Sequence, residues 1–305
     1  MPDLTKRNFK LGIGTQLDYQ LAYINSDFEN VVISHIVGNY MNHSSFPLYL
    51  SIHGKKGEGK TFQTLRVCSK YRVSTYYISG AELCGSYEKD SIGAIEENLN
   101  KALHDFQTTQ EMSVFIIDDF HLSIASTELG VGKTVNSQIL TGFLMNLADK
   151  AKATKNARIP IILLGNDFNN LYDPLTRDGR MDFFEWNPTL QEKISIVCSH
   201  FDDIVFHQND KEKLIKLITK YDSQPISFFA EVKNDLSKNI ICDYLRLHSQ
   251  LDIRTLLYNI NQLSIQIENN NESCIPTIES CIEKRLNNLL QKTITHEERG
   301  KLHNA

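Results

Sequence analysis

Short apolar runs alternate with amphipathic segments over the first part of the chain. Four of these runs have the β-branched and aromatic composition of buried strands, and they fall at residues 48–52, 75–78, 114–117 and 161–164. Between them, apolar residues recur with the period of a helix. Strands that alternate with helices favour a parallel sheet covered by helices. We therefore predict an α/β domain over residues 31–187.

Helical spacing replaces the strand pattern after Pro188. Apolar residues then recur three or four positions apart, as at Leu214, Leu217 and Ile218. This spacing is typical of helices that bury one face. It predicts a smaller helical domain over residues 188–267.

The two ends of the chain are expected to lie outside these domains. Residues 1–30 lack strong periodicity and form an N-terminal extension, in which 16–24 could be one amphipathic helix. Residues 268–305 combine a polar linker, one helix and a tail that frays from about residue 295. The apolar stripe of that helix needs a partner surface, and its members are Ile278, Ile282, Leu286, Leu289 and Leu290.

Composition and charge narrow the classes to which the protein can belong. With 305 residues, of which 41% are hydrophobic, the chain can bury a sizeable core, yet no apolar run approaches the ~20 residues that cross a bilayer. The formal charge of −5 argues against a dedicated nucleic-acid surface. The N-terminus carries no apolar export signal, so we expect a cytoplasmic protein that binds neither membrane nor nucleic acid.

A glycine-rich segment follows the first predicted strand. Residues 54–61, GKKGEGKT, fit the pattern G-x-x-x-x-G-K-[ST] and precede a helical run. In such a loop the backbone N–H groups surround phosphates, and the helix N-terminus favours their negative charge. We expect Lys60 to reach the β and γ phosphates of ATP and the Thr61 hydroxyl to bind Mg²⁺. The nucleotide-binding residues of this segment are expected to be Gly54, Gly57, Glu58, Gly59, Lys60, Thr61 and Phe62.

Two carboxylates end the third predicted strand. Asp118 and Asp119 directly follow the apolar run 114–117. We expect them beside the glycine-rich loop, because ligands of open α/β sheets bind at the carboxyl ends of the strands. Asp118 would hold Mg²⁺, and Asp119 would orient the attacking water or accept its proton. Alone, such a pair is often only a strand entering a loop; the upstream motif favours the catalytic interpretation.

The fourth predicted strand and the block after it supply further polar groups. Asn166 ends the strand and could hydrogen-bond the attacking water or the γ phosphate. Residues 171–182 resemble the second region of homology of AAA proteins, which implies that Arg177 and Arg180 enter the nucleotide site of a neighbouring subunit. The protein would then form a homo-oligomeric ring or spiral. The alternative is a surface salt-bridge cluster of these arginines with Asp173, Asp178 and Asp182.

Several segments together resemble Rubisco activase of the green plant and cyanobacterial type. They are residues 54–61, 134–136, 144–149, 157–162, 165–168, 171–172, 177–181 and Trp186. The resemblance covers roughly residues 30–290. It implies an AAA+ P-loop fold, with a parallel sheet sandwiched by helices and a smaller helical lid domain. It also implies an ATP- and Mg²⁺-dependent hexamer that acts on Rubisco as its protein client and releases inhibitory sugar phosphates.

The chain departs from the activase pattern at two motifs. Activases carry Asn-Asp-Leu-Asp where this chain has Asp-Asp-Phe-His at residues 118–121. The arginine expected in the helical domain, after a pair that matches Phe228 and Phe229, falls on Lys233. A lysine can contact the γ phosphate only as a point charge, without the bidentate geometry of arginine.

Two loops that are expected to line a central pore also differ from the activases. In the first we choose Tyr87 as the candidate contact with the client, although a surface tyrosine fits equally well; the second comprises residues 122–133. These loops and Lys233 favour a scaffold that uses ATP to assemble and cluster Rubisco without remodelling it. The intact catalytic motifs favour the remodeller. A clamp loader or helicase-like motor fits the motifs but not the charge.

Overall fold

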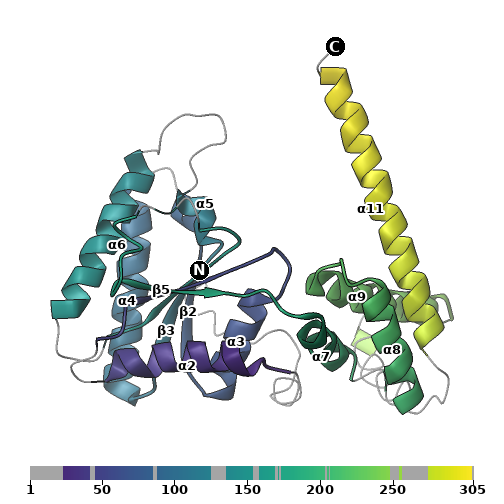
Figure 1. The fold of residues 1–305 in the computed structure, drawn as a ribbon, viewed down its shortest axis with the longest axis horizontal. Helices are drawn as coiled ribbons and strands as arrows, with labels where there is room; N and C mark the ends of the chain where they lie inside the picture. Colours follow the sequence, from purple (N-terminus) through teal and green to yellow (C-terminus); the bar gives the residue numbers. More distant parts are fainter. Residues whose placement is uncertain are drawn as a thin grey trace. The chain divides into compact units, whose positions relative to one another are not determined.

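Five strands form a wholly parallel sheet in the computed structural model (Figure 1). They are β1 (Tyr49–His53), β2 (Ser74–Ser79), β3 (Ser113–Asp118), β4 (Ile161–Gly165) and β5 (Met181–Glu185), in the spatial order β2-β3-β4-β1-β5. Because all five run in the same direction, their carboxyl ends meet at one edge of the sheet. The α/β fold class and the four strands predicted from the sequence are confirmed.

The structure describes most of the chain. The described residues are 23–41, 45–84, 88–124, 135–153, 158–168, 171, 173–202, 205, 207–247, 254–255 and 274–303. They belong to two compact units, Met1–Asn187 and Pro188–Ala305. The first unit contains the sheet.

The edge strand β5 was not predicted. Only Met181 of its five side chains is buried, because β5 pairs with β1 alone. The strand therefore lacks the apolar run that identifies the other four. Strand β5 ends next to Trp186, at the same edge of the sheet as the end of β1, where the glycine-rich segment begins.

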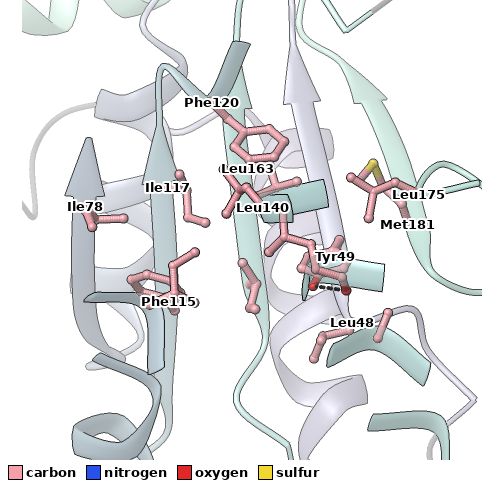
Figure 2. Packing of buried hydrophobic residues seen from close by; sticks show 14 of the residues in the cluster. Leu48, Tyr49, Ile78, Phe115, Ile117, Phe120, Leu140, Leu163, Leu175 and Met181 are labelled. Carbon is pink, nitrogen blue, oxygen red and sulfur yellow. Dashed lines mark hydrogen bonds between the residues drawn. The ribbon is translucent and has the colours of Figure 1, made fainter. Parts of the chain in front are cut away.

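One face of the sheet packs on the helices α4 (Glu88–Thr109) and α6 (Val135–Ala153). Alternate strand residues, such as Tyr49, Phe115 and Leu163, gather in this core (Figure 2). The Tyr49 hydroxyl donates a hydrogen bond of 2.7 Å to the carbonyl of Leu144 on α6. The buried phenol thus keeps a partner while its ring fills the core.

The opposite face is covered by α2 (Ser26–Tyr40) and α3 (Lys60–Lys70). The Phe28 ring of α2 meets the rings of Phe184 and Trp186 edge-on, with centroids 5.6 Å and 5.0 Å away. The helices are also joined by the backbone N–H of Asn25, which donates to Gln63 Oε1 at 3.3 Å. Helix α2 is thus an integral part of the first unit.

This packing corrects the expected boundary at residue 30, which falls inside α2. Helix α2 begins at Ser26, because the Asn25 side chain caps it by accepting from the N–H of Phe28 at 2.9 Å. Most of the helix expected at 16–24 lies outside the described residues, and its last two positions are not helical.

Two short helices follow the carboxyl ends of β2 and β3. The 3-10 helix η1 (Glu82–Cys84) comes after β2, and α5 (Phe120–Ile124) comes directly after the end of β3. Phe120 is fully buried, so α5 is anchored to the core (Figure 2). This anchoring fixes the segment that directly follows the two predicted carboxylates, Asp118 and Asp119.

Every element of the second unit in the described part of the chain is a helix. The helices are α7 (Leu190–Phe201), α8 (Gln208–Lys220), α9 (Ile226–Leu247) and α11 (Ile275–His303). Helix α7 starts with a reciprocal capping box between Thr189 and Glu192. No helix among the described residues is both long and apolar enough to cross a membrane.

Helix α11 carries the apolar stripe that needed a partner. Ile278 and Ile282 are fully buried, and α11 packs against α9 and α8. Further along, Leu289 is 44% exposed and Leu290 is 63% exposed, so the partner surface covers only the first turns. The helix continues to His303, which corrects the frayed tail expected from residue 295. The boundary expected at residue 268 lies outside the described residues.

A buried histidine should make the stability of the first unit depend on pH. His35 of α2 is 2% exposed, and burial lowers its pKa from 6.5 to about 3, with the charge of Arg158 acting in the same direction. The unfolded chain therefore binds a proton below pH ~6.5 that the folded chain excludes. Between pH 6 and pH 4 this group should lower the free energy of unfolding by about 2–3 kcal/mol.

Urea unfolding followed by the fluorescence of Trp186 measures this effect. His35→Leu removes the proton site and should flatten the pH dependence over this range. The remaining slope would come from carboxylates, whose protonation acts mainly at lower pH. Parallel loss of stability in both proteins would contradict the assignment to His35.

Candidate nucleotide site

The glycine-rich segment 54–61 comprises the loop 54–59, which joins β1 to α3 through glycines with positive φ, and the first two residues of α3. The φ angles of Gly54, Gly57 and Gly59 are 145°, 82° and 81°. A Cβ on Gly54 would lie only 2.1 Å from the carbonyl oxygen of Trp186, so a side chain is excluded there. Gly59 is the N-cap of α3 in the left-handed conformation. This places a helix N-terminus directly after a glycine-rich loop, an arrangement that suits phosphate.

Trp186 ties this loop to the end of β5. Its backbone N–H donates to the carbonyl of His53 at 2.7 Å, and its indole Nε1–H donates to the carbonyl of Glu58 at 2.6 Å. Trp186 is 3% exposed and Glu58 is 6% exposed. The Phe62 ring, one turn further on, lies 5.3 Å from Cζ of Arg66. Trp186 thus holds the end of β1 through its backbone and the loop through its indole.

Lys60 lies across the loop with its amino group fully engaged. Its Nζ donates to the carbonyl oxygens of Gly54 at 2.7 Å and Lys55 at 2.9 Å, and to Oδ1 of Asn166 at 3.1 Å. Burial lowers the pKa of Lys60, and the negative charges of Asp118, Asp119 and Glu58 oppose this shift. The predicted phosphate-binding lysine and the predicted Asn166 are therefore brought together.

The carboxylate of Asp118 lies at the end of β3 and accepts three hydrogen bonds. Oδ2 accepts from the Thr61 hydroxyl at 2.9 Å and from the Tyr77 hydroxyl at 2.7 Å. Oδ1 accepts from the backbone N–H of Asp119 at 2.9 Å. Burial and the Asp118 charge raise the pKa of Tyr77, which keeps its phenol protonated. A hydroxyl beside a carboxylate is an oxygen donor set that fits Mg²⁺.

Asp119 is exposed next to this cluster. Its φ is +51°, a left-handed conformation that Asp and Asn tolerate better than most residues. The preceding peptide is held by the residue that follows β2, because the N–H of Gly80 donates to the carbonyl of Asp118 at 2.6 Å. The two neighbouring carboxylates therefore differ: Asp118 is fixed by three donors, whereas Asp119 faces solvent.

Asn166 connects Lys60 to α5. Its Oδ1 accepts from Lys60, while its Nδ2 lies 3.5 Å from Nε2 of His121. An imidazole nitrogen that accepts from this amide would fix which end of the Asn166 side chain faces the lysine. His121 thus belongs to the site, although the sequence marked it only as a departure from the activase pattern.

The two arginines of the 171–182 block have different surroundings. The Arg180 guanidinium makes two hydrogen bonds to Asp149 on α6, at 2.9 Å and 2.7 Å, and a third to the carbonyl of Pro174. Asp149 is thus its acidic partner, rather than Asp173, Asp178 or Asp182. The Arg177 side chain is exposed and makes no hydrogen bond or ion pair with any residue that the structure describes.

Lys233 belongs to the second unit, on α9. Its Nζ donates to the carbonyl of His200 on α7 at 2.7 Å. The neighbouring Phe228 and Phe229 are buried and meet edge-on, with ring centroids 5.4 Å apart. A contact of Lys233 with nucleotide therefore stays a prediction.

Two predicted features lie outside the described residues. One is Tyr87, the candidate client contact. The other is most of the second pore loop, because the described chain ends at Ile124 and resumes at Val135.

Sequence reasoning missed three side chains of the site, namely Tyr77, His121 and Trp186. A signal existed for Trp186, the single tryptophan of the chain. Tyr77 is the next-to-last residue of the predicted strand 75–78, where nothing in its local pattern separates it from Tyr76. Its role follows only from the pairing of β2 with β3.

The chain resembles characterised proteins over this region. The AAA family, the ATPase family associated with various cellular activities, matches residues 50–189. The ribulose bisphosphate carboxylase/oxygenase activase of Anabaena sp. (strain CA / ATCC 33047) is 35% identical over 234 residues, which are 73% of this chain and 56% of that protein. The chloroplastic activase of Malus domestica is 33% identical over 226 residues, covering 69% of this chain and 50% of its own length.

The chain thus spans about half the length of the curated relatives it matches. The matched region contains the sheet, the glycine-rich loop and the carboxylates of β3. These observations show an AAA domain over residues 50–189 and a similarity to activases over about 70% of the chain.

Proposed function

We propose that the protein hydrolyses ATP and uses the energy to remodel Rubisco, releasing inhibitory sugar phosphates from it. The observation that carries the proposal is the convergence of Lys60, Thr61, Asp118 and Asn166 at one edge of the sheet. The similarity to activases supports Rubisco as the client.

Each residue has a distinct role in this proposal. The backbone of the loop 54–61 binds the phosphates, and Lys60 exchanges its bonds to loop carbonyls for bonds to the β and γ oxygens. Thr61 and Asp118 hold Mg²⁺, which neutralises charge that develops on the phosphates. Asn166 and Asp119 orient the attacking water, and Asp119 takes up its proton.

We propose that a homo-oligomer, six subunits in a ring or spiral, completes the site. Arg177 supports this arrangement, because it is exposed and has no charged partner among the residues that the structure describes, and a neighbouring subunit would supply one. Arg180, which is bound to Asp149, would hold the loop that presents Arg177. Lys233 would contact the γ phosphate from the helical unit.

A scaffold that clusters Rubisco without remodelling it is the second candidate. Lys233 favours it, because a lysine replaces the expected arginine and donates to a carbonyl of its own unit. In a scaffold, ATP would drive the assembly of the protein with Rubisco. The rate of ATP hydrolysis would then not depend on Rubisco.

Steady-state ATPase assays with and without Rubisco, together with co-sedimentation, test the proposal. The remodeller should hydrolyse ATP in the presence of Mg²⁺, and Rubisco should change the rate. The proposed function would be contradicted if the chain bound no ATP. It would also be contradicted if Rubisco changed neither the rate of ATP hydrolysis nor the sedimentation of the chain.

Asp119→Asn should separate binding from hydrolysis. Asn tolerates the positive φ of this position, so the fold should be kept while the proton-accepting carboxylate is lost. We expect bound ATP and Mg²⁺ to be retained, with turnover reduced by about 10²–10⁴-fold. Single-turnover measurement of phosphate release checks this, and normal turnover would remove Asp119 from the mechanism.

A further inference from the structure

Two adjacent tyrosines of β2 face opposite sides of the sheet and hold different carboxylates. Tyr76 is 7% exposed, and its hydroxyl donates to Oδ2 of Asp105 on α4. Tyr77 points the other way, and its hydroxyl donates to Oδ2 of Asp118 at 2.7 Å. Such alternation is expected for successive residues of a strand. Only the second tyrosine therefore reaches the nucleotide site.

The pairing of β2 with β3 explains why Tyr77 reaches Asp118. Tyr77 is in register with Ile116, and Ser79 is in register with Asp118, so the tyrosine lies diagonally two residues before the carboxylate. A diagonal neighbour on the same face is within reach of a long aromatic side chain. The contact is thus set by the strand register.

Tyr77 and Thr61 share one oxygen of Asp118, yet they differ in what they can do when metal binds. Thr61 is the first-turn residue of α3, and its hydroxyl oxygen is a predicted Mg²⁺ ligand. The Tyr77 hydroxyl comes from a neighbouring strand and donates to the carboxylate, so it can orient the carboxylate. The χ2 torsion of an aspartate has a broad energy minimum, so the carboxylate can rotate easily. A fixed hydrogen-bond donor is therefore needed to hold the plane of the carboxylate.

We propose that Tyr77 is a positioning residue for the metal site: its hydroxyl orients the Asp118 carboxylate so that Asp118 and Thr61 together bind Mg²⁺ with ATP. This inference rests on the proposed function and adds a residue to it. Partners that orient metal-binding carboxylates typically contribute 10–100-fold to metal affinity. Tyr77 would contribute through Asp118, without touching the reacting atoms.

Metal affinity, rather than activity alone, tests the role of Tyr77. We would titrate Mn²⁺ into the full chain with a non-hydrolysable ATP analogue and follow the loss of the free-ion signal by electron paramagnetic resonance. Tyr77→Phe keeps the ring and removes only the hydroxyl. It should weaken Mn²⁺ binding by about 10–100-fold, while affinity for the analogue in EDTA stays unchanged.

Tyr76→Phe is the matched control, because it removes the neighbouring hydroxyl and its bond to Asp105 on the other face. It should leave the Mn²⁺ affinity at the level of the unmodified chain. In ATPase assays, raising the Mg²⁺ concentration should restore turnover to Tyr77→Phe. A purely structural role for Tyr77 would not produce this recovery.

The possible failures are distinguishable. Equal Mn²⁺ affinity in Tyr77→Phe and the unmodified chain would overturn this inference alone. Equal weakening in both tyrosine variants would also overturn it, since the cause would then be general loosening of β2. An unmodified chain that binds no ATP analogue, with or without metal, would overturn the proposed function and this inference with it.

Discussion

Lys60→Ala should abolish ATP turnover while the fold survives. In the structure, Nζ of Lys60 donates to two carbonyl oxygens of the loop and to Asn166. Among the described residues, no other charged donor of the segment 54–61 makes both kinds of bond. Alanine leaves the negative phosphates without this cation. Removing one preorganised donor from developing charge typically lowers turnover by about 10²–10³-fold, and we expect at least this loss.

Lys56→Ala is the matched control for this experiment. Lys56 is an exposed lysine of the same loop, so its removal changes the charge equally without removing a phosphate contact. Binding of a fluorescent ATP analogue and release of phosphate measure the two variants. Urea unfolding, followed by Trp186, checks the fold. Wild-type turnover in Lys60→Ala would contradict the assignment of the nucleotide site.

Arg177→Ala should leave ATP binding intact and remove almost all hydrolysis. The side chain is exposed, so its loss should not disturb its own subunit. Arginines supplied to the site of a partner contribute about 10³–10⁵-fold to turnover in GTPases, and we expect a loss in this range. Phosphate release and nucleotide affinity, measured on the same preparation, should therefore separate.

Mixing variants tests whether Arg177 acts in trans. Subunits that carry Arg177→Ala or Asp119→Asn should each be inactive, yet their mixture should recover part of the turnover. At some interfaces, Asp119 from one chain and Arg177 from the other complete a site. Demonstrated co-assembly without recovery at any ratio would contradict trans action, and so would full ATPase activity in Arg177→Ala monomers.

Arg180→Ala provides a comparison within the same loop. Loss of its bonds to Asp149 and Pro174 should disturb the loop in its own chain as well as lower turnover. Stability should therefore fall for Arg180→Ala and not for Arg177→Ala. The salt bridge is partly exposed, so the change in stability should be small.

The central strands β1, β3 and β4 were predictable because each contains a buried apolar run. The edge strand β2 was predictable from its aromatic and β-branched residues, although it is only partly buried. Strand β5 was not, since four of its side chains remain accessible at the edge of the sheet. Helix α2 was assigned partly to an extension, because the contacts that tie it to the sheet come from Phe184 and Trp186, far along the chain. Burial created by distant residues leaves little local signal.

The site shows the same division. The glycine-rich loop and the carboxylates of β3 follow motifs in which spacing along the chain sets the chemistry. The bond between Tyr77 and Asp118 depends on strand register, and the bond between Arg180 and Asp149 joins a loop to a helix. Such partners are chosen by the tertiary fold. Sequence could place Arg180 in a salt bridge but not identify its acidic partner.

Release of an inhibitory sugar phosphate from Rubisco is the measurement that tests the proposed function most directly. Rubisco carrying the inhibitor would be mixed with the protein, and recovery of carboxylation would be followed in time. We predict that ATP accelerates release with the unmodified chain, whereas ADP, or the Asp119→Asn chain with ATP, does not. ATP-dependent co-sedimentation with Rubisco, without faster release, would contradict the remodeller and favour the scaffold.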